Sequence, residues 1–229
     1  LFKLGGFIQP PPEAVMVGID RRVAQELELN RNVTQWPRST HAQLIDKLVS
    51  RGVAVIVMDI AFIESRTSEE DAELTAAVAR AQRVVLLEYT RRETAQAGGI
   101  IMDRLNSPIP PLLDAAVGVA PFVLPKEPVR LYQFWAFRDI AGDTPTIPGV
   151  ALQVYALRLL DPFLELLREH GFPDPDSLPR DRSEVRNAQD LRELMRKLRL
   201  GFRENLQLQE RLLGTLSSEN DAGWSLNER

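Results

Sequence analysis

The chain has 229 residues, of which 44% are hydrophobic and 26% charged, and its formal net charge is −4. This length suffices for one large or two small globular domains, and the small charge gives no reason to expect nucleic acid as a partner. The absence of cysteine excludes disulfides, thiolate zinc sites and a cysteine nucleophile. No apolar run approaches the roughly 20 residues of a membrane-spanning helix.

The first predicted elements are a buried strand and a helix. The apolar run Ala14–Ile19 ends at Asp20 and is typical of a buried strand. A helix is predicted to begin near Arg38 or Ser39, because apolar residues follow at helical spacing, and to stop at Gly52.

Two further strands, with a helix between them, complete the predicted core. Val53–Ile60 is an almost continuous β-branched run, as expected for a central parallel strand covered on both faces. A helix over 67–82 opens with hydroxyl and acidic residues, which suit the positive end of a helix dipole. Val84–Leu87 is the next strand. This alternation predicts right-handed βαβ units, and therefore an α/β fold with a mainly parallel sheet flanked by helices.

The middle of the chain is divided into short pieces by prolines and glycines. Strands are predicted over 119–124 and 130–137, and helices over 151–160 and 162–170. A proline-rich, charged linker over 171–183 follows.

A long C-terminal amphipathic helix is predicted from Glu184 to Leu213, because apolar residues recur there at helical spacing among many charges. Its apolar stripe packs either against the α/β body or in a dimer contact. Its basic residues are interpreted as a solvated face, with contact to anionic lipid as the alternative: Arg192, Arg196, Lys197, Arg199 and Arg203.

The usual catalytic and nucleotide-binding motifs are absent. The sequence has no P-loop, no GxGxxG after the first predicted strand, no GxSxG elbow and no HExxH. Its two histidines, His41 and His170, are too few for a multi-histidine metal site. We therefore predict no catalytic residue, no metal and no cofactor.

One group of polar residues is predicted to converge at an edge of the sheet. The carboxyl ends of parallel strands share one edge, where open α/β sheets bind their ligands. The helix that begins near residue 38 runs back from the same edge. The predicted cluster therefore combines residues from two strand ends and one helix start: Asp20, Trp36, Arg38, His41, Asp59 and Glu64.

Several roles fit this cluster. Carboxylates beside an arginine and a histidine suit a cation, a charged ligand or acid–base chemistry. We favour a structural interpretation, in which Arg38 bridges Asp20 and Asp59 through charge-assisted hydrogen bonds. Ligand binding is the next alternative, and catalysis the last. A tryptophan at a loop or strand end, such as Trp36 or Trp135, more often packs than stacks on a ligand.

The order of these residues resembles a known family, the CHASE sensory domain of the second type. The resemblance covers roughly residues 12–160. It is carried by AVMVGID (14–20), WPRSTHA (36–42), VIVMDIAF (55–62), VVL (84–86), PPLLDAAVG (110–118) and TIPGVALQVYA (146–156). This succession is more specific than any of its motifs alone.

The resemblance implies a sensor without chemistry of its own. Members of the family are extracytoplasmic input modules of bacterial adenylate cyclases, histidine kinases and serine/threonine kinases, anchored in the inner membrane by helices outside the module. The chain is accordingly expected to sense a small-molecule or envelope signal on the periplasmic face, to be no enzyme, and to form a homodimer in the intact receptor. Asp20, Trp36, Arg38, His41 and Asp59 occupy the polar motif positions of the family.

The resemblance also sets the expected domain boundaries. Residues 1–170 form the sensor domain, 171–183 the linker, 184–216 the charged amphipathic helix and 217–229 a polar tail. The family usually closes with another strand and a helix that leads to the membrane, neither of which is found in 171–229. This segment is either an insertion or an alternative ending.

Two other functions stay open. One is a metal-dependent α/β enzyme that uses Asp20, Asp59 and His41, and the other is a non-catalytic module for protein contacts in the envelope. Stabilisation by a metal that is lost in Asp59→Ala favours the enzyme. A surface without a cavity near the strand ends favours the contact module.

Overall fold

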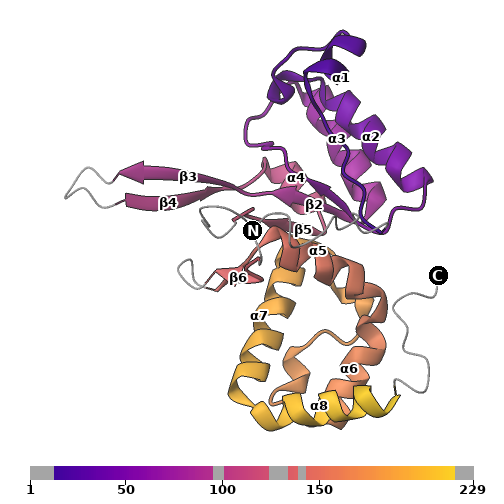
Figure 1. The fold of residues 1–229 in the computed structure, drawn as a ribbon, viewed down its shortest axis with the longest axis vertical. Helices are drawn as coiled ribbons and strands as arrows, with labels where there is room; N and C mark the ends of the chain where they lie inside the picture. The colour runs from indigo at the N-terminus through magenta and orange to yellow at the C-terminus, as the bar shows by residue number, and fades with distance from the viewer. Residues whose placement is uncertain (1–12, 95–100, 124–133, 139–142, 220–229) are drawn as a thin grey trace, which may run out of the picture. The chain divides into compact units, whose positions relative to one another are not determined.

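The computed structural model describes four stretches of the chain, residues 13–94, 101–123, 134–138 and 143–219 (Figure 1). The chain divides into two compact units, Leu1–Trp36 and Pro37–Arg229. In the described part of the N-terminal unit, α1 (Arg21–Glu26) is followed by the 3₁₀ helix η1 (Val33–Gln35). The second unit contains the strands and the other helices.

The strand predicted over 14–19 is not formed. Residues 13–20 are irregular, and the side chains of Val15 and Met16 are 85% and 95% exposed. The prediction was wrong because an apolar run becomes a strand only where another strand supplies its hydrogen bonds. None of the strands in the described ranges pairs with this segment.

A three-stranded parallel sheet forms the centre of the second unit. Its strands are hydrogen-bonded in the order β1-β2-β5: β1 (Ile56–Met58), β2 (Val84–Leu87) and β5 (Gly118–Ala120). In the register, Met58 lies opposite Leu86 and Leu86 opposite Val119. The sheet confirms the predicted α/β class, although β1 is shorter than the run predicted over 53–60.

The helices α2 (Arg38–Ser50) and α3 (Ser68–Ala81) begin and end where the sequence predicts. The hydroxyl of Thr67 caps α3 by accepting from the backbone N–H of Glu70 at 3.3 Å. Gly52 follows the end of α2 with φ +78°, a left-handed conformation that costs glycine little. Apolar periodicity therefore predicts both helices, with the Thr67 cap marking the start of α3 and Gly52 the end of α2.

The sheet is covered on both faces, as expected of a parallel sheet (Figure 1). Val84 and Leu86 of β2 belong to the core that α2, α3 and α4 (Pro110–Ala115) cover. Val85 points the other way, into the core that α5 (Ile147–Ala156) covers. All three side chains are fully buried. The alternation of one strand thus joins two hydrophobic cores.

The C-terminal helices enlarge the core on the α5 side. They are α6 (Leu160–Glu169), α7 (Ala188–Glu204) and α8 (Leu206–Glu219). The helix predicted from Glu184 to Leu213 is therefore two helices. Asn205 interrupts it with φ −134° and ψ 84°, and the Asn205 side chain accepts from the N–H of Leu208 to start α8.

The segment between α6 and α7 is packed and hydrogen-bonded. Its side chains Phe172, Leu178 and Val185 are buried in the core on the α5 side. It contains the 3₁₀ helices η4 (Pro175–Ser177) and η5 (Arg182–Glu184). The proline-rich segment thus contributes to the core, while the boundaries expected at residues 170, 183 and 216 stay predictions.

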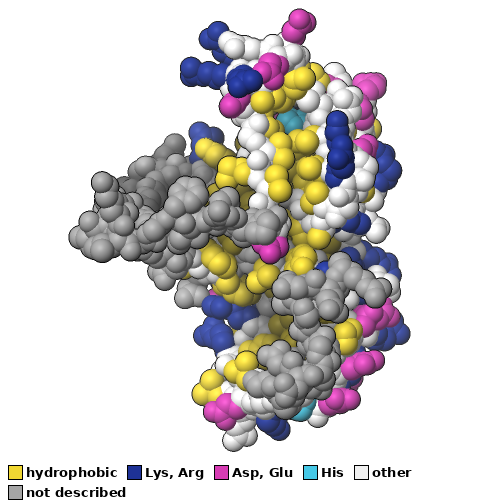
Figure 2. Space-filling model, turned by 45° about the vertical axis from the view of Figure 1, so that its right-hand side comes forward, with side chains coloured by type: hydrophobic (Ala, Val, Ile, Leu, Met, Phe, Trp, Pro, Cys, Tyr) yellow, Lys and Arg dark blue, Asp and Glu magenta, His cyan; other side chains and the backbone are white. Residues whose placement is uncertain are grey.

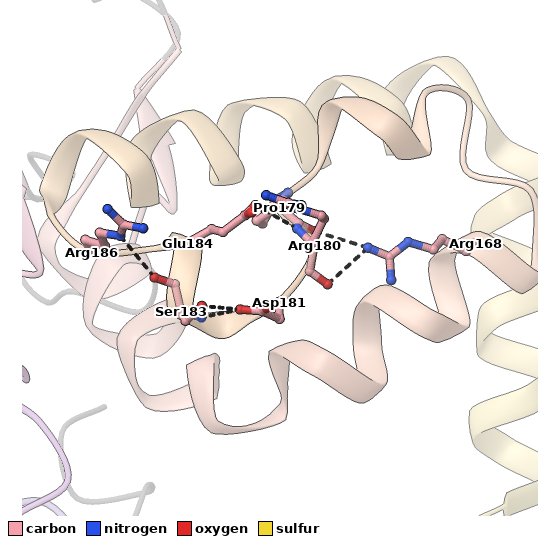
Figure 3. Close-up of polar contacts among 7 residues, drawn as sticks. All are labelled: Arg168, Pro179, Arg180, Asp181, Ser183, Glu184 and Arg186. Carbon is pink, nitrogen blue, oxygen red and sulfur yellow. Dashed lines mark hydrogen bonds and ion pairs between the residues drawn. The ribbon is translucent and has the colours of Figure 1, made fainter.

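A polar network fixes the turn of this segment (Figure 3). Arg168 of α6 donates to the carbonyl oxygens of Pro179 and Arg180 at 3.2 and 3.3 Å. Arg180 in turn pairs with Glu184 at 2.7 Å. Hydrogen bonds from Ser183 lower the pKa of the exposed Asp181 carboxyl. These local bonds replace the backbone ladder that the irregular segment lacks.

Two antiparallel pairs were not predicted. The strands β3 (Tyr89–Thr94) and β4 (Ile101–Asn106) form a hairpin that extends away from the helices (Figure 1). The shorter pair is β6 (Phe137–Arg138) with β7 (Thr144–Pro145). Of the strand predicted over 130–137, residues 130–133 lie outside the described residues, and in the described remainder only Phe137 is in a strand.

Candidate functional site

The start of α2 carries the first part of the candidate site. Pro37 occupies the N-cap position and has no side chain that can accept a hydrogen bond. The carboxylate of Glu70, near the start of α3, takes over this role by accepting from the backbone N–H of Arg38 at 3.3 Å. The two helix starts are thereby joined.

The side chain of Arg38 lies in the interior. The residue is 3% exposed, and its Nη2 donates to the carbonyl oxygen of Glu64 at 2.5 Å. Its Nε lies 3.2 Å from Asp71 Oδ1, and the guanidinium lies over the Phe62 ring, 4.9 Å from the centroid. Burial lowers the pKa of Arg38, and the Asp71 carboxylate opposes this shift. Arg38 Nη1 has no hydrogen-bond partner among the described residues.

His41 lies one turn further along α2 and is 2% exposed. Its ring meets the edge of Phe62 at 5.4 Å between centroids. Burial, together with the charges of Arg38 and Arg66, lowers the pKa of His41 to about 4. At neutral pH the imidazole is uncharged and closed off from solvent, so it supports the cluster by packing.

The loop before α3 completes the arrangement. The N–H of Arg66 donates to Asp71 Oδ2 at 2.9 Å, and the Arg66 side chain pairs with Glu70 at 3.7 Å. Phe62, at the start of this loop, also accepts from the N–H of Ile109 before α4. The cluster therefore joins the start of α2, the loop after β1 and the start of α3.

Three of the predicted residues in this unit come together, but in other roles than expected. Arg38 and His41 form the interior, and Glu64 contributes its backbone carbonyl while its side chain is exposed. Asp59 directly follows β1 and is exposed. The ion pair found for Arg38 is with Asp71, where the structural interpretation predicted a bridge between Asp20 and Asp59.

Asp20 and Trp36 have local roles within the N-terminal unit. Asp20 Oδ1 accepts from the backbone N–H groups of Arg22 and Val23 at 2.9 and 3.0 Å and so caps α1. Trp36 is buried, and its Nε1 donates to the carbonyl oxygen of Asn30 at 2.5 Å. Both contacts are typical of local structure. The convergence of Asp20 with Asp59 stays a prediction.

Two acidic residues of the cluster were not predicted as members of it. Glu70 and Asp71 were interpreted as favourable charges at a helix start. The local signal that could have identified Asp71 is its place in the first turn of α3, four residues after the capping Thr67. An acid at that position can reach back over the preceding loop as well as favour the helix dipole.

A buried acid outside this cluster, Glu88, was also missed. It directly follows β2 and is 4% exposed. Ser107 Oγ donates to its Oε1 at 2.8 Å, and Arg192 of α7 donates to its Oε2 at 3.2 Å. Arg192 stands 104 residues away in the sequence. No local pattern signals such a pair.

Basic residues of α7 bond within the chain. Lys197 donates to the carbonyl oxygen of Ser177 at 2.6 Å, and Arg199 and Arg203 both pair with Asp143. Arg192 also bonds within the chain, to Glu88, whereas Arg196 and Arg203 are exposed, as expected of a solvated face. Figure 2 shows acidic and basic side chains interspersed over the face that it draws.

Two further properties of the described residues concern possible ligands and location. No group of three or more His, Asp or Glu side chains within the described ranges is arranged to hold a metal ion. None of the helices in that part of the chain combines the length and apolar character that a bilayer crossing requires.

The fold and the cluster define a class of protein: an α/β domain with a covered parallel sheet, whose interior charges are tied to one another and to the backbone. A family model for the CHASE2 domain matches residues 1–210, and the chain belongs to this family. CHASE2 domains are extracytoplasmic sensor modules. Neither the curated proteins nor the solved structures gave a match. The family match extends beyond residue 170 and includes α7.

Proposed function

We propose that this chain is the extracytoplasmic input domain of a bacterial transmembrane receptor, and that it relays a small-molecule or envelope signal to a cytoplasmic cyclase or kinase. The match of the CHASE2 model over residues 1–210 is the observation that carries this proposal. The parent protein would be anchored in the inner membrane with the module on its periplasmic face, and the receptor would act as a homodimer.

The ligand-binding edge lies at the carboxyl end of the parallel sheet, where open α/β sheets bind ligands. Asp59 and Glu64 follow β1 and expose their side chains, so they are the groups that meet the ligand. Arg38 and His41 are buried and hold the loop that carries both acids.

The exposed carboxylates favour a ligand with a positively charged group. A ligand changes the receptor only if it binds one signalling state more tightly than the other. A loop fixed by Arg38 to two helix starts suits this requirement, because a shift of the loop also moves α2 and α3.

The buried His41 disfavours the metal-dependent enzyme. A general base must reach the proton that it removes and accept it near the working pH. His41 is 2% exposed, and its pKa of about 4 lies well below neutrality. The imidazole therefore lacks both properties.

The location is tested with reporter fusions to the module in its parent protein. Alkaline phosphatase requires the oxidising periplasm for its disulfides, and β-galactosidase is active in the cytoplasm. We expect phosphatase activity and no galactosidase activity from fusions within residues 13–94. The opposite pattern would contradict the proposed function.

A further inference from the structure

Glu88 and Arg192 form an ion pair at the carboxyl end of β2, the central strand of the sheet. Each carboxylate oxygen of Glu88 meets one donor, Ser107 Oγ on one side and Arg192 Nη2 on the other. The same Nη2 also donates to the carbonyl oxygen of Val119 in β5 at 3.0 Å. One guanidinium of α7 therefore holds the ends of two neighbouring strands.

Helix α7 packs directly against the sheet, so a shift of the strand ends would also move this helix. The helix lies against β5, the strand at one edge of the sheet. Its first residue, Ala188, is buried in the core beneath α2 and α3, while Leu191 and Leu194 are buried in the core beneath α5. A change at the strand ends thus reaches a helix that contacts both cores.

The two partners differ in their access to solvent. The side chain of Glu88 is 5% exposed, whereas that of Arg192 is 42% exposed. A buried ion pair adds little net stability, but the loss of one partner leaves the other unpaired and is costly. Because only Arg192 can exchange its partner for water, the pair opens by movement of Arg192 and α7.

The pair also lies next to the proposed ligand-binding edge. Met58 lies opposite Leu86 in the register, so Asp59 is level with Leu87, one residue before Glu88. A positive charge bound beside Asp59 would weaken the attraction between Glu88 and Arg192.

We propose that the Glu88–Arg192 pair is the contact through which a cationic ligand at the sheet edge loosens α7. The ligand part of this inference rests on the proposed sensor function. The mechanical part, that this pair holds α7 to the sheet, depends only on the chain itself.

Hydrogen–deuterium exchange of the whole chain tests the mechanical part. In Glu88→Gln we expect the amides of α7 to exchange at least about tenfold faster, because local opening loses one charged contact, while α2 and α3 keep their rates. Arg192→Met should give the same result and is tolerated in folding, because this side chain is half-exposed. The double variant should exchange no faster than either single one, since both remove the same contact.

Glu193→Gln is the matched control. It makes the same charge change as Glu88→Gln, but on α7 itself, where it breaks the pair of Glu193 with Lys197, and the Glu193 side chain is 52% exposed. We expect no change in α7. Unchanged α7 exchange in both Glu88→Gln and Arg192→Met, or an equal rise in α2, α3 and α7, overturns the inference. Neither result affects the reporter fusions that judge the sensor proposal.

Discussion

The charge state of each buried polar residue in this chain depends on the balance between the cost of burying a charge and the contacts that stabilise it. Arg38 is a charged side chain inside the protein, and its stability depends on the Asp71 carboxylate and the Glu64 carbonyl. His41 avoids this cost, because its lowered pKa keeps the imidazole uncharged at neutral pH. The cluster thus combines a charged Arg38 beside the Asp71 carboxylate with a His41 imidazole that burial keeps neutral.

Removal of Asp71 should destabilise the protein much more than removal of Asp46, an exposed acid that also forms an ion pair between α2 and α3. Asp71→Ala leaves the Arg38 guanidinium buried without its carboxylate, at a cost of about 3 kcal/mol. The control is Asp46→Ala, which breaks the exposed pair of Asp46 with Arg80 and should cost less than about 1 kcal/mol. Urea unfolding measures both, and equal costs would contradict the structural role of Asp71.

The stability of the protein should fall as the pH falls from about 6.5 to about 4. His41 has a pKa of about 4 when folded and an ordinary pKa when unfolded. The unfolded chain therefore binds more protons in this window, and His41 loses up to about 3 kcal/mol of stability across it. In His41→Gln the unfolding free energy should therefore differ less between pH 7 and pH 4 than it does in the natural chain. A variant with the same pH dependence as the natural chain would refute this assignment.

Local sequence signals predict the helices of this protein well, because the backbone hydrogen bonds of a helix form within the helix itself. Helix α3 was predictable from its Thr67 cap, its first-turn acids and its apolar spacing, and α2 from its apolar spacing and the Gly52 that follows it. The segment 14–19 was not, because a strand depends on a partner elsewhere in the chain. The break at Asn205 was missed for a related reason, since the apolar spacing continues across it.

The same substitution should have opposite effects in the two last helices. A methyl group on Gly201 of α7 would overlap the Phe172 ring, whereas none of the described atoms lies within 4 Å of a methyl group on Gly214 of α8. Gly201→Ala should destabilise the protein by about 1–3 kcal/mol through overpacking. Gly214→Ala should stabilise it by about 0.5–1 kcal/mol through helix propensity. Thermal unfolding measures the change in melting temperature of both variants. Changes in the same direction would contradict the close contact of Gly201 with the Phe172 ring.

The whole second unit depends on its C-terminal helices. The core beneath α5 contains Leu191 and Leu194 from α7 and Leu208 from α8, all of which are buried. In this unit α7 lies against β5, and both C-terminal helices contribute side chains to the core that α5 covers.

A chain shortened to residues 1–170 should fail to unfold cooperatively. Its truncation removes α7 and α8 and exposes the apolar side chains that they cover, which favours aggregation. A chain that ends at residue 219 keeps every described helix and should unfold like the full chain. Near-ultraviolet circular dichroism during heating measures both. A cooperative transition for residues 1–170 would support the shorter domain expected from the sequence.

Family membership and much of the central fold were predictable from the sequence, whereas the contacts of the site were not. Strand β2 and helices α2 and α3 are encoded in short segments whose propensities agree with their final packing. The candidate cluster was predicted as a group, but its ion pair is with Asp71, because several acids near a strand end are equivalent in sequence and only packing selects one.

By itself the sequence determined the α/β class, the parallel strand–helix–strand core and the CHASE2 family, because these depend on patterns that repeat within a few turns or strands. The tertiary structure alone decided that Arg38 and His41 are buried and that Glu88 meets Arg192 from 104 residues away. Burial and long-range pairing depend on where distant segments pack. No local pattern carries that information.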